Sequence, residues 1–247
     1  MIYPILLSLF AGGFATGLGG LILISLKEIN KKILGFCLGF SSGVMIIIGI
    51  KDLFGKSIEM GNYYFAALSF IGGALLILAM DIFIPHTFFF KERGFESKEK
   101  FDMLKVGMLV AFGITIHNIP EGMIVGAGYL VTPIFGFILA IAIALHNIPE
   151  GIAVSAPLCA AGCSKKKVFL ISLISGFSEP IGAIIALAII SFIPGVLPLL
   201  LGFTGGVMTY ITMDELIPTA RKYGHSHAIS TGLILGLIIT LLLGNLI

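Results

Sequence analysis

The chain alternates between long runs of apolar residues and short polar stretches. The apolar runs cover residues 4–26, 33–53, 63–89, 104–129, 133–159, 168–191, 196–219 and 228–247. An α-helix needs about 20 residues to cross roughly 30 Å of hydrocarbon, and the runs have about that length or more. Closed β-barrels also span membranes, but their strands are short and alternate between apolar and polar residues. The pattern therefore predicts an all-α integral membrane protein with eight transmembrane helices in one domain, 1–247.

The composition supports a membrane protein and excludes several classes of partner. Apolar residues make up 57% of the chain and charged residues only 11%, whereas soluble domains carry about 25% charged residues. The net charge is +2 and no basic stripe with interleaved aromatics is present, so we expect lipid around the helices and no nucleic acid partner. No basic residue precedes the first run, which favours a spanning helix over a cleaved signal peptide.

Lysine and arginine are distributed unequally between the connecting segments. If the eight runs are spans, 13 of these residues lie on one side and only Lys51 and Lys56 on the other. Because basic loops stay in the cytoplasm, we expect a multi-pass protein of the cell membrane with both termini outside. The longest loop, about 90–103, is then cytoplasmic.

One hexapeptide occurs twice, as His117-Asn118-Ile119-Pro120-Glu121-Gly122 and His146-Asn147-Ile148-Pro149-Glu150-Gly151. Each copy lies near the middle of a span. His and Glu at i and i+4 share a helix face, about 6 Å apart along the axis, and both side chains are good zinc ligands. The proline lacks an N–H, so we expect the fourth and fifth helices to be kinked. Kinked or broken helices at mid-membrane are a common way to build ion sites.

Ionisable groups at this depth need partners, because each costs about 2.5–3.5 kcal/mol on insertion scales. A third carboxylate, Glu179, precedes a proline in the next span. Three carboxylates, two imidazoles and two amides exceed one tetrahedral site and suit two adjacent cations. The alternative, buried hydrogen-bonding residues that only fix the packing, explains the exact repeat less well.

Other polar residues lie near the ends of spans. Asp81, His86, Asp214 and Glu215, near the cytoplasmic ends of the third and seventh spans, would form an exit site or act as interfacial charges. Met45, Asp52 and Glu59 follow at steps of seven along the second span. They would form an outward stripe at the entrance, or else Met45 packs in the core and the two acids are solvated.

Two further functions fit buried metal ligands. An intramembrane zinc-dependent hydrolase would hold zinc with three protein ligands and keep a water on the fourth position. However, the chain lacks a His-Glu-x-x-His helix, and its excess of carboxylates favours ion passage over catalysis. A channel-like cation pore would differ from a carrier only in its kinetics. We therefore expect a transporter, not an enzyme, without an organic cofactor.

The two hexapeptides, Ser-Gly-x-x-Glu in the next span and Asp-Glu-Leu-Ile-Pro after it resemble the ZIP family of metal transporters, in its bacterial ZupT/GufA-type branch. The stretch Leu38–Met45 resembles the second helix of that branch. The resemblance implies an eight-helix bundle with external termini and uptake of zinc into the cytoplasm. It also leaves a homodimer open. Mixed nitrogen and oxygen ligands would select poorly among Zn²⁺, Fe²⁺, Co²⁺, Mn²⁺ and Cd²⁺.

The resemblance further implies a binuclear centre between the fourth and fifth helices. The first metal would bind His117, Glu121, His146 and Glu150, and the second Asn118, Glu121, Asn147, Glu150 and Glu179. Asp81, His86, Asp214 and Glu215 match the exit residues of the family. The loop at about 90–103 departs from many relatives because it lacks histidine clusters.

Overall fold

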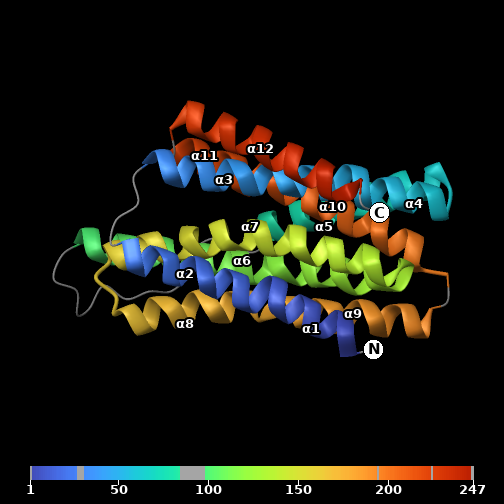
Figure 1. The fold of residues 1–247 in the computed structure, drawn as a ribbon, viewed down its shortest axis with the longest axis horizontal. Coiled ribbons are helices and arrows are strands. Elements are labelled where there is room, and N and C mark those ends of the chain that lie inside the picture. The colour runs from blue at the N-terminus through green and yellow to red at the C-terminus, as the bar shows by residue number, and fades with distance from the viewer. Residues whose placement is uncertain (1, 27–30, 84–97, 194, 224, 246–247) are drawn as a thin grey trace.

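The computed structural model describes residues 2–26, 31–83, 98–193, 195–223 and 225–245. In this part of the chain all regular secondary structure is helical, and the helices join end to end into eight rods (Figure 1). The rods are, in order, α1 (Ile2–Ser8) with η1 (Leu9–Phe14) and α2 (Ala15–Leu26); α3 (Lys31–Ile46) with η2 (Ile47–Phe54) and α4 (Gly55–Met60); α5 (Tyr63–Phe83); α6 (Lys98–Val131); α7 (Pro133–Ala160); α8 (Lys165–Gly176) with α9 (Ser178–Phe192); α10 (Leu197–Ile211) with η3 (Thr212–Leu216) and α11 (Ile217–Tyr223); and α12 (Ser226–Gly244). The predicted all-α fold is confirmed.

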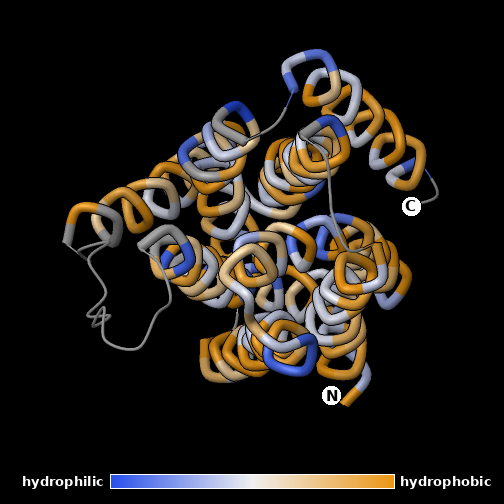
Figure 2. Tube along the Cα trace, turned by 90° about the vertical axis from the view of Figure 1, so that its left-hand side faces the viewer, coloured by the Kyte–Doolittle hydropathy of each residue, from blue (hydrophilic) through white to orange (hydrophobic). Residues whose placement is uncertain are grey.

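The rods carry apolar side chains on the outside of the molecule as well as in its core. Among the described residues, six helical segments are long and apolar enough to cross a membrane, and Tyr63–Ala79 is a shorter apolar helix. Large apolar side chains such as Tyr64 and Phe192 are mostly exposed. Figure 2 shows apolar residues along the helices and hydrophilic residues gathered near helix ends. Such a surface is suited to lipid rather than water.

The rods form two bundles, which Figure 1 shows as a lower and an upper group. In the first bundle α6 packs against α7 and α9, and α2 packs against α7 and α8. In the second bundle α3 packs against α12, and α5 packs against α10. The bundles meet where α7 lies against α3 and α6 lies against α10. The two hexapeptides therefore lie in the helices that join the bundles.

Glycines bring helix backbones into direct contact within each bundle. A Cβ atom at Gly43 of α3 would collide with the carbonyl of Leu233 on α12, and one at Gly206 of α10 with the carbonyl of Phe70 on α5. Small residues at such crossings let membrane helices approach closely. These contacts therefore set the spacing between α3 and α12 and between α5 and α10.

Both termini lie at one end of the molecule, together with the turn between α6 and α7 (Figure 1). At the opposite end, which we call the lysine-rich end, lie the last turn of α2, the first turn of α3, the connection α7–α8 and the lysines at the start of α8. This arrangement agrees with the relative placement of loops that the eight-span pattern predicts.

Three predicted boundaries differ from the structure. The second rod continues through η2 and α4 to Met60, not to 53. The loop predicted at about 90–103 is helical from Lys98, because Phe101 and Leu104 are buried. The sixth span, predicted as one helix, is interrupted at Phe177 between α8 and α9. Residues 84–97 lie outside the described part of the chain.

Candidate metal centre

The two hexapeptides face each other because α6 and α7 run antiparallel around a tight turn. Thr132 forms the turn, and its Oγ1 accepts a hydrogen bond of 3.1 Å from the Phe135 N–H, which caps α7. Pro120 and Pro149 both lie inside continuous helices. The prolines therefore do not interrupt these helices; a bend of the axis stays a prediction.

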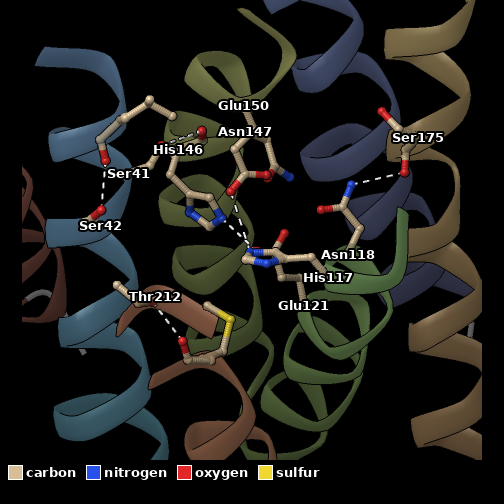
Figure 3. Close-up of polar contacts among 12 residues, drawn as sticks. Ser41, Ser42, His117, Asn118, Glu121, His146, Asn147, Glu150, Ser175 and Thr212 are labelled. Atoms are coloured by element: carbon tan, nitrogen blue, oxygen red, sulfur yellow. Dashed lines mark hydrogen bonds and ion pairs between the residues drawn. The ribbon is translucent and has the colours of Figure 1, made fainter. Parts of the chain in front are cut away.

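The histidines and glutamates of the two copies meet in the buried space between α6 and α7 (Figure 3). Oε1 of Glu121 lies 3.0 Å from Nε2 of His117 and 2.9 Å from Nε2 of His146. Oε1 of Glu150 lies 3.5 Å from Nε2 of His117. One oxygen of Glu121 thus faces both imidazoles, and the Glu150 carboxylate lies next to one of them.

Three of these side chains already satisfy the spacing of a metal site. His117, Glu121 and Glu150 each offer one ligand atom, and these atoms lie within 4.8 Å of one another. Because zinc binds imidazole nitrogen and carboxylate oxygen at about 2.0–2.2 Å, a cation between them would contact all three after small side-chain movements. All three side chains are buried, so a bound ion would exchange most of its water for protein ligands.

A second group of polar side chains adjoins the first. Asn147 Nδ2 donates to the carbonyl of Ala11 at 2.8 Å and to Oε2 of Glu179 at 3.0 Å. Asn118 Nδ2 donates to the carbonyl of Ser175 at 3.1 Å (Figure 3). These bonds occupy the amide nitrogens of Asn118 and Asn147. The two Oδ1 atoms have no hydrogen-bond partner among the described residues. Both oxygens are therefore available as ligands.

Glu179 occupies the first turn of α9, immediately after the interruption of the sixth rod. The carboxyl group of Glu179 is fully buried and accepts a hydrogen bond from the Asn147 amide. The interruption of the sixth rod beside Glu179 was not predicted from the sequence.

The glycine that ends each hexapeptide has a packing role. A Cβ atom at Gly122 would collide with the carbonyl of Glu179 on α9, and one at Gly151 with the carbonyl of Thr16 on α2. Each copy is thus pressed against a neighbouring backbone of the first bundle. This contact positions the glutamate directly before the glycine and the histidine five residues before it.

Ser41 of α3 contributes a contact that sequence reasoning did not identify. Its Oγ donates to the backbone carbonyl of His146 at 2.9 Å, and both residues are fully buried. Adjacent Ser42 instead donates to the carbonyl of Leu38 in its own helix. The sequence shows the adjacent serines Ser41 and Ser42 but does not say which of them faces α7.

The first rod also supplies groups that the sequence did not single out. The carbonyl of Ala11, which binds Asn147, lies in the π-helix η1. A Cβ atom at Gly12 would collide with the side chain of Glu179. The several glycines of this rod were the available signal, since π-helical turns and close helix approach are common at functional sites.

The predicted entrance residues Met45, Asp52 and Glu59 all lie in the second rod and differ in burial. Met45 is fully buried in the core, whereas Glu59 is exposed and pairs with Lys56 at 2.8 Å. Asp52 is buried in η2, with Lys51 at 3.4 Å. A common stripe of the three side chains stays a prediction.

The predicted exit residues are only partly described. Asp214 lies in η3 and its side chain is exposed. The side chains of Asp81 and Glu215, and all of His86, lie outside the described residues.

Comparison with known proteins identifies the family. A profile described as ZIP zinc transporter matches residues 91–244, which include α6, α7 and both hexapeptides. The chain belongs to the ZIP family. This ZIP chain, with its buried cluster of histidines and glutamates, is therefore a member of a transporter family and not of an enzyme family.

Full-length relatives agree with the profile. This ZIP chain is 38% identical to the zinc transporter ZupT of Chlorobium chlorochromatii, over 97% of the chain and 95% of the relative. It is 41% identical to the ZupT of Oceanobacillus iheyensis, over 96% and 95%. Identity to the ZupT of Clostridium perfringens is 39%, over 95% and 92%. The similarity thus extends over both bundles.

Proposed function

We propose that this chain is an uptake transporter for zinc, and more broadly for divalent transition-metal ions, in the cell membrane. The observation that carries the proposal is the shared oxygen of Glu121, which lies within 3.0 Å of both imidazoles. Relatives that match along nearly the whole chain are named zinc transporters, which supports zinc as the ion carried. Both termini would face outside and the lysine-rich end the cytoplasm.

The proposed centre holds two cations. His117, Glu121, His146 and Glu150 would bind the first ion. Asn118, Asn147 and Glu179 would bind the second together with the two shared glutamates. Three buried carboxylates support this assignment, because burying several negative charges together is costly unless cations balance them. Ligation by nitrogen and oxygen without thiolate would allow release, and it would select poorly among Zn²⁺, Fe²⁺, Co²⁺, Mn²⁺ and Cd²⁺.

The proposed route leads from the end that carries the termini to the lysine-rich end. Asp52, buried at the first of these ends, would attract incoming cations. Asp214, exposed in η3, would lie on the exit side with Asp81, His86 and Glu215. No observation on the described residues favours the hydrolase alternative over transport.

The test is zinc influx into proteoliposomes loaded with a zinc-sensitive dye. We expect saturable influx for the natural sequence and loss of influx for Glu150→Ala and His117→Asn. His225→Asn is the matched control, since His225 is exposed outside the cluster at the start of α12, and it should transport normally. Tight zinc binding by folded protein without any influx would refute transport.

A further inference from the structure

Two histidines outside the buried centre stand close together at the start of α12. The ring centres of His225 and His227 are 5.7 Å apart, and the ring planes are tilted by 44° to each other. Both side chains are exposed. Since α12 begins at the lysine-rich end (Figure 1), the pair lies at the end away from the two termini. The two imidazoles are therefore accessible to ions in solvent and separate from the centre between α6 and α7.

The geometry at the beginning of α12 explains why the two rings are neighbours. His225 is the N-cap residue, with an extended backbone (φ −98°, ψ 128°), and His227 is the second residue of the helix. The side chain of an N-cap residue leans over the first turn, toward the second and third helical residues. The ring of His225 makes no capping hydrogen bond, so its nitrogens are not committed to the backbone of the helix beside which it lies.

The spacing of the two rings is close to that of two imidazoles on one metal ion. Zinc binds imidazole nitrogen at about 2.0–2.1 Å, and the ligands of a tetrahedral ion are about 109° apart. With about 1.1 Å from the nitrogen to the ring centre, two imidazoles that share a zinc ion have ring centres roughly 5.2 Å apart. The observed distance of 5.7 Å exceeds this value by only about 0.5 Å. Small rotations of the exposed side chains would bring one nitrogen of each ring onto the same ion.

The backbone that carries the two histidines is anchored to the second bundle. The N–H of Ile229 donates to the carbonyl of His225 at 3.0 Å, which closes the first turn of α12. Ile229 itself is buried and packs with Leu38 of α3 and Ala220 of α11. A bound ion would therefore order only the two side chains and not the chain that carries them, which lowers the entropic cost of binding.

We propose that His225 and His227 together bind one divalent transition-metal ion at the lysine-rich end, in addition to the ions of the buried centre. Each imidazole supplies one nitrogen, and water completes the coordination. Imidazole suits Zn²⁺, Cu²⁺ and Ni²⁺, whereas Mg²⁺ and Ca²⁺ prefer oxygen ligands.

This surface site should bind zinc more weakly than the buried centre. It offers two protein ligands in solvent, and the start of a helix carries partial positive charge. Because the pair is not part of the buried centre, its loss should leave zinc influx unchanged, and the two sites can be tested separately.

The experiment measures how zinc chloride protects the two exposed imidazoles from diethyl pyrocarbonate, which modifies free imidazole nitrogen. The purified protein in lipid nanodiscs is compared with its Glu150→Ala variant, so that the result does not depend on the buried centre. Peptide mass spectrometry reports each histidine separately. We expect zinc to slow the modification of both rings at least about fivefold, because a ligated nitrogen has no free lone pair. Both rings should be protected over the same range of zinc concentration. Cu²⁺ should act at lower concentration than zinc, and Mg²⁺ should have no effect.

Replacing one histidine should expose the other. In His225→Asn, the zinc concentration that half protects His227 should rise at least about tenfold, since loss of even an outer partner of a metal ligand costs about 10–100-fold in affinity. Asparagine is a favoured N-cap residue, so this variant keeps the start of α12. His227→Gln should have the reciprocal effect on His225. Ser226→Ala, at the exposed position between the two histidines, is the matched control and should leave the protection of both unchanged.

Three results would overturn the proposal. If zinc protected His227 equally well in His225→Asn, each imidazole would bind zinc alone and no ion would be shared. If zinc protected neither ring, the two rings would only pack against each other, as aromatic rings do at about 4.5–7 Å. If Mg²⁺ protected them as well as zinc, the effect would be one of charge and not of ligation. Protection that persists in a protein without zinc influx would refute the proposed function alone and leave the surface site intact.

Discussion

Nε2 of His146 on α7 lies 2.9 Å from Oε1 of Glu121 on α6, although the two residues belong to different copies of the hexapeptide. The same oxygen lies 3.0 Å from His117 of its own copy. Each motif alone would form an incomplete site on one helix. The antiparallel pairing of α6 and α7 joins the copies, so that one carboxylate serves both histidines.

Replacing Glu121 by glutamine should therefore weaken zinc binding more than the loss of a single contact would suggest. Glu121→Gln keeps the shape but removes a negative charge next to both imidazoles. Since loss of a partner that only orients a ligand costs about 10–100-fold in metal affinity, we expect a loss of at least about 100-fold here. Calorimetry on the purified protein measures this change, and influx into proteoliposomes should be abolished.

Glu59→Gln is the control for Glu121→Gln. Glu59 is exposed and pairs with Lys56, and exposed ion pairs contribute little, about 0–1 kcal/mol. Zinc affinity should stay within twofold. Similar losses in both variants would mean that the negative charge acts at long range and that Glu121 is not a ligand.

Zinc binding should weaken as the pH falls. An imidazole must be neutral to offer its lone pair to a metal, and an ordinary histidine becomes protonated near pH 6.5. Protonation therefore competes with zinc, so affinity is greatest above this pH and is lost below it. We expect at least a tenfold weaker affinity at pH 5.5 than at pH 7.5, measured by calorimetry. A flat profile over this range would exclude His117 and His146 as ligands.

The sequence predicts much of this architecture because its strongest signals are long and repeated. Apolar runs of about 20 residues leave few alternatives to spanning helices, and an exact repeat places two histidines and two glutamates on facing helices. The spacing of His117 and Glu121 at i and i+4 is a local property that any helix would realise. This contact within the first copy therefore follows from helical periodicity, whereas the contact between Glu121 and His146 requires the two helices to pack together.

Other features depend on tertiary contacts and could not be predicted. The π-helices η1 and η2 were not predicted, because the geometry of a π-helical turn depends on the packing around it. The position of the helix interruption also depended on context: Pro120 and Pro149 are accommodated, whereas the sixth rod is broken before Glu179. Which of Ser41 and Ser42 faces α7 is decided by how α3 packs.

The glycine of the second hexapeptide should tolerate no side chain. Gly151→Ala places a methyl group against the carbonyl of Thr16, and overpacking of this kind costs about 1–3 kcal/mol. We expect a lower unfolding temperature and a loss of zinc affinity. Gly72→Ala is the matched control, because a Cβ atom at this helical glycine meets nothing within 4 Å, and alanine is the better helix former by about 1 kcal/mol. Greater stability of Gly151→Ala would contradict the packing described for α2 and α7.

Ser41 and its neighbour Ser42 donate to different carbonyls: Ser41 to that of His146, and Ser42 to that of Leu38 in its own helix. Both are fully buried, but only Ser41 reaches across to α7 and holds the backbone of a proposed ligand. Loss of a buried hydrogen bond costs about 1 kcal/mol, or roughly fivefold in an equilibrium constant. We expect Ser41→Ala to weaken zinc binding by about this factor, whereas Ser42→Ala should stay within twofold. Calorimetry on both variants, with unfolding temperatures as a check of the fold, decides between them. Equal effects would mean that the contact between α3 and α7 does not position His146.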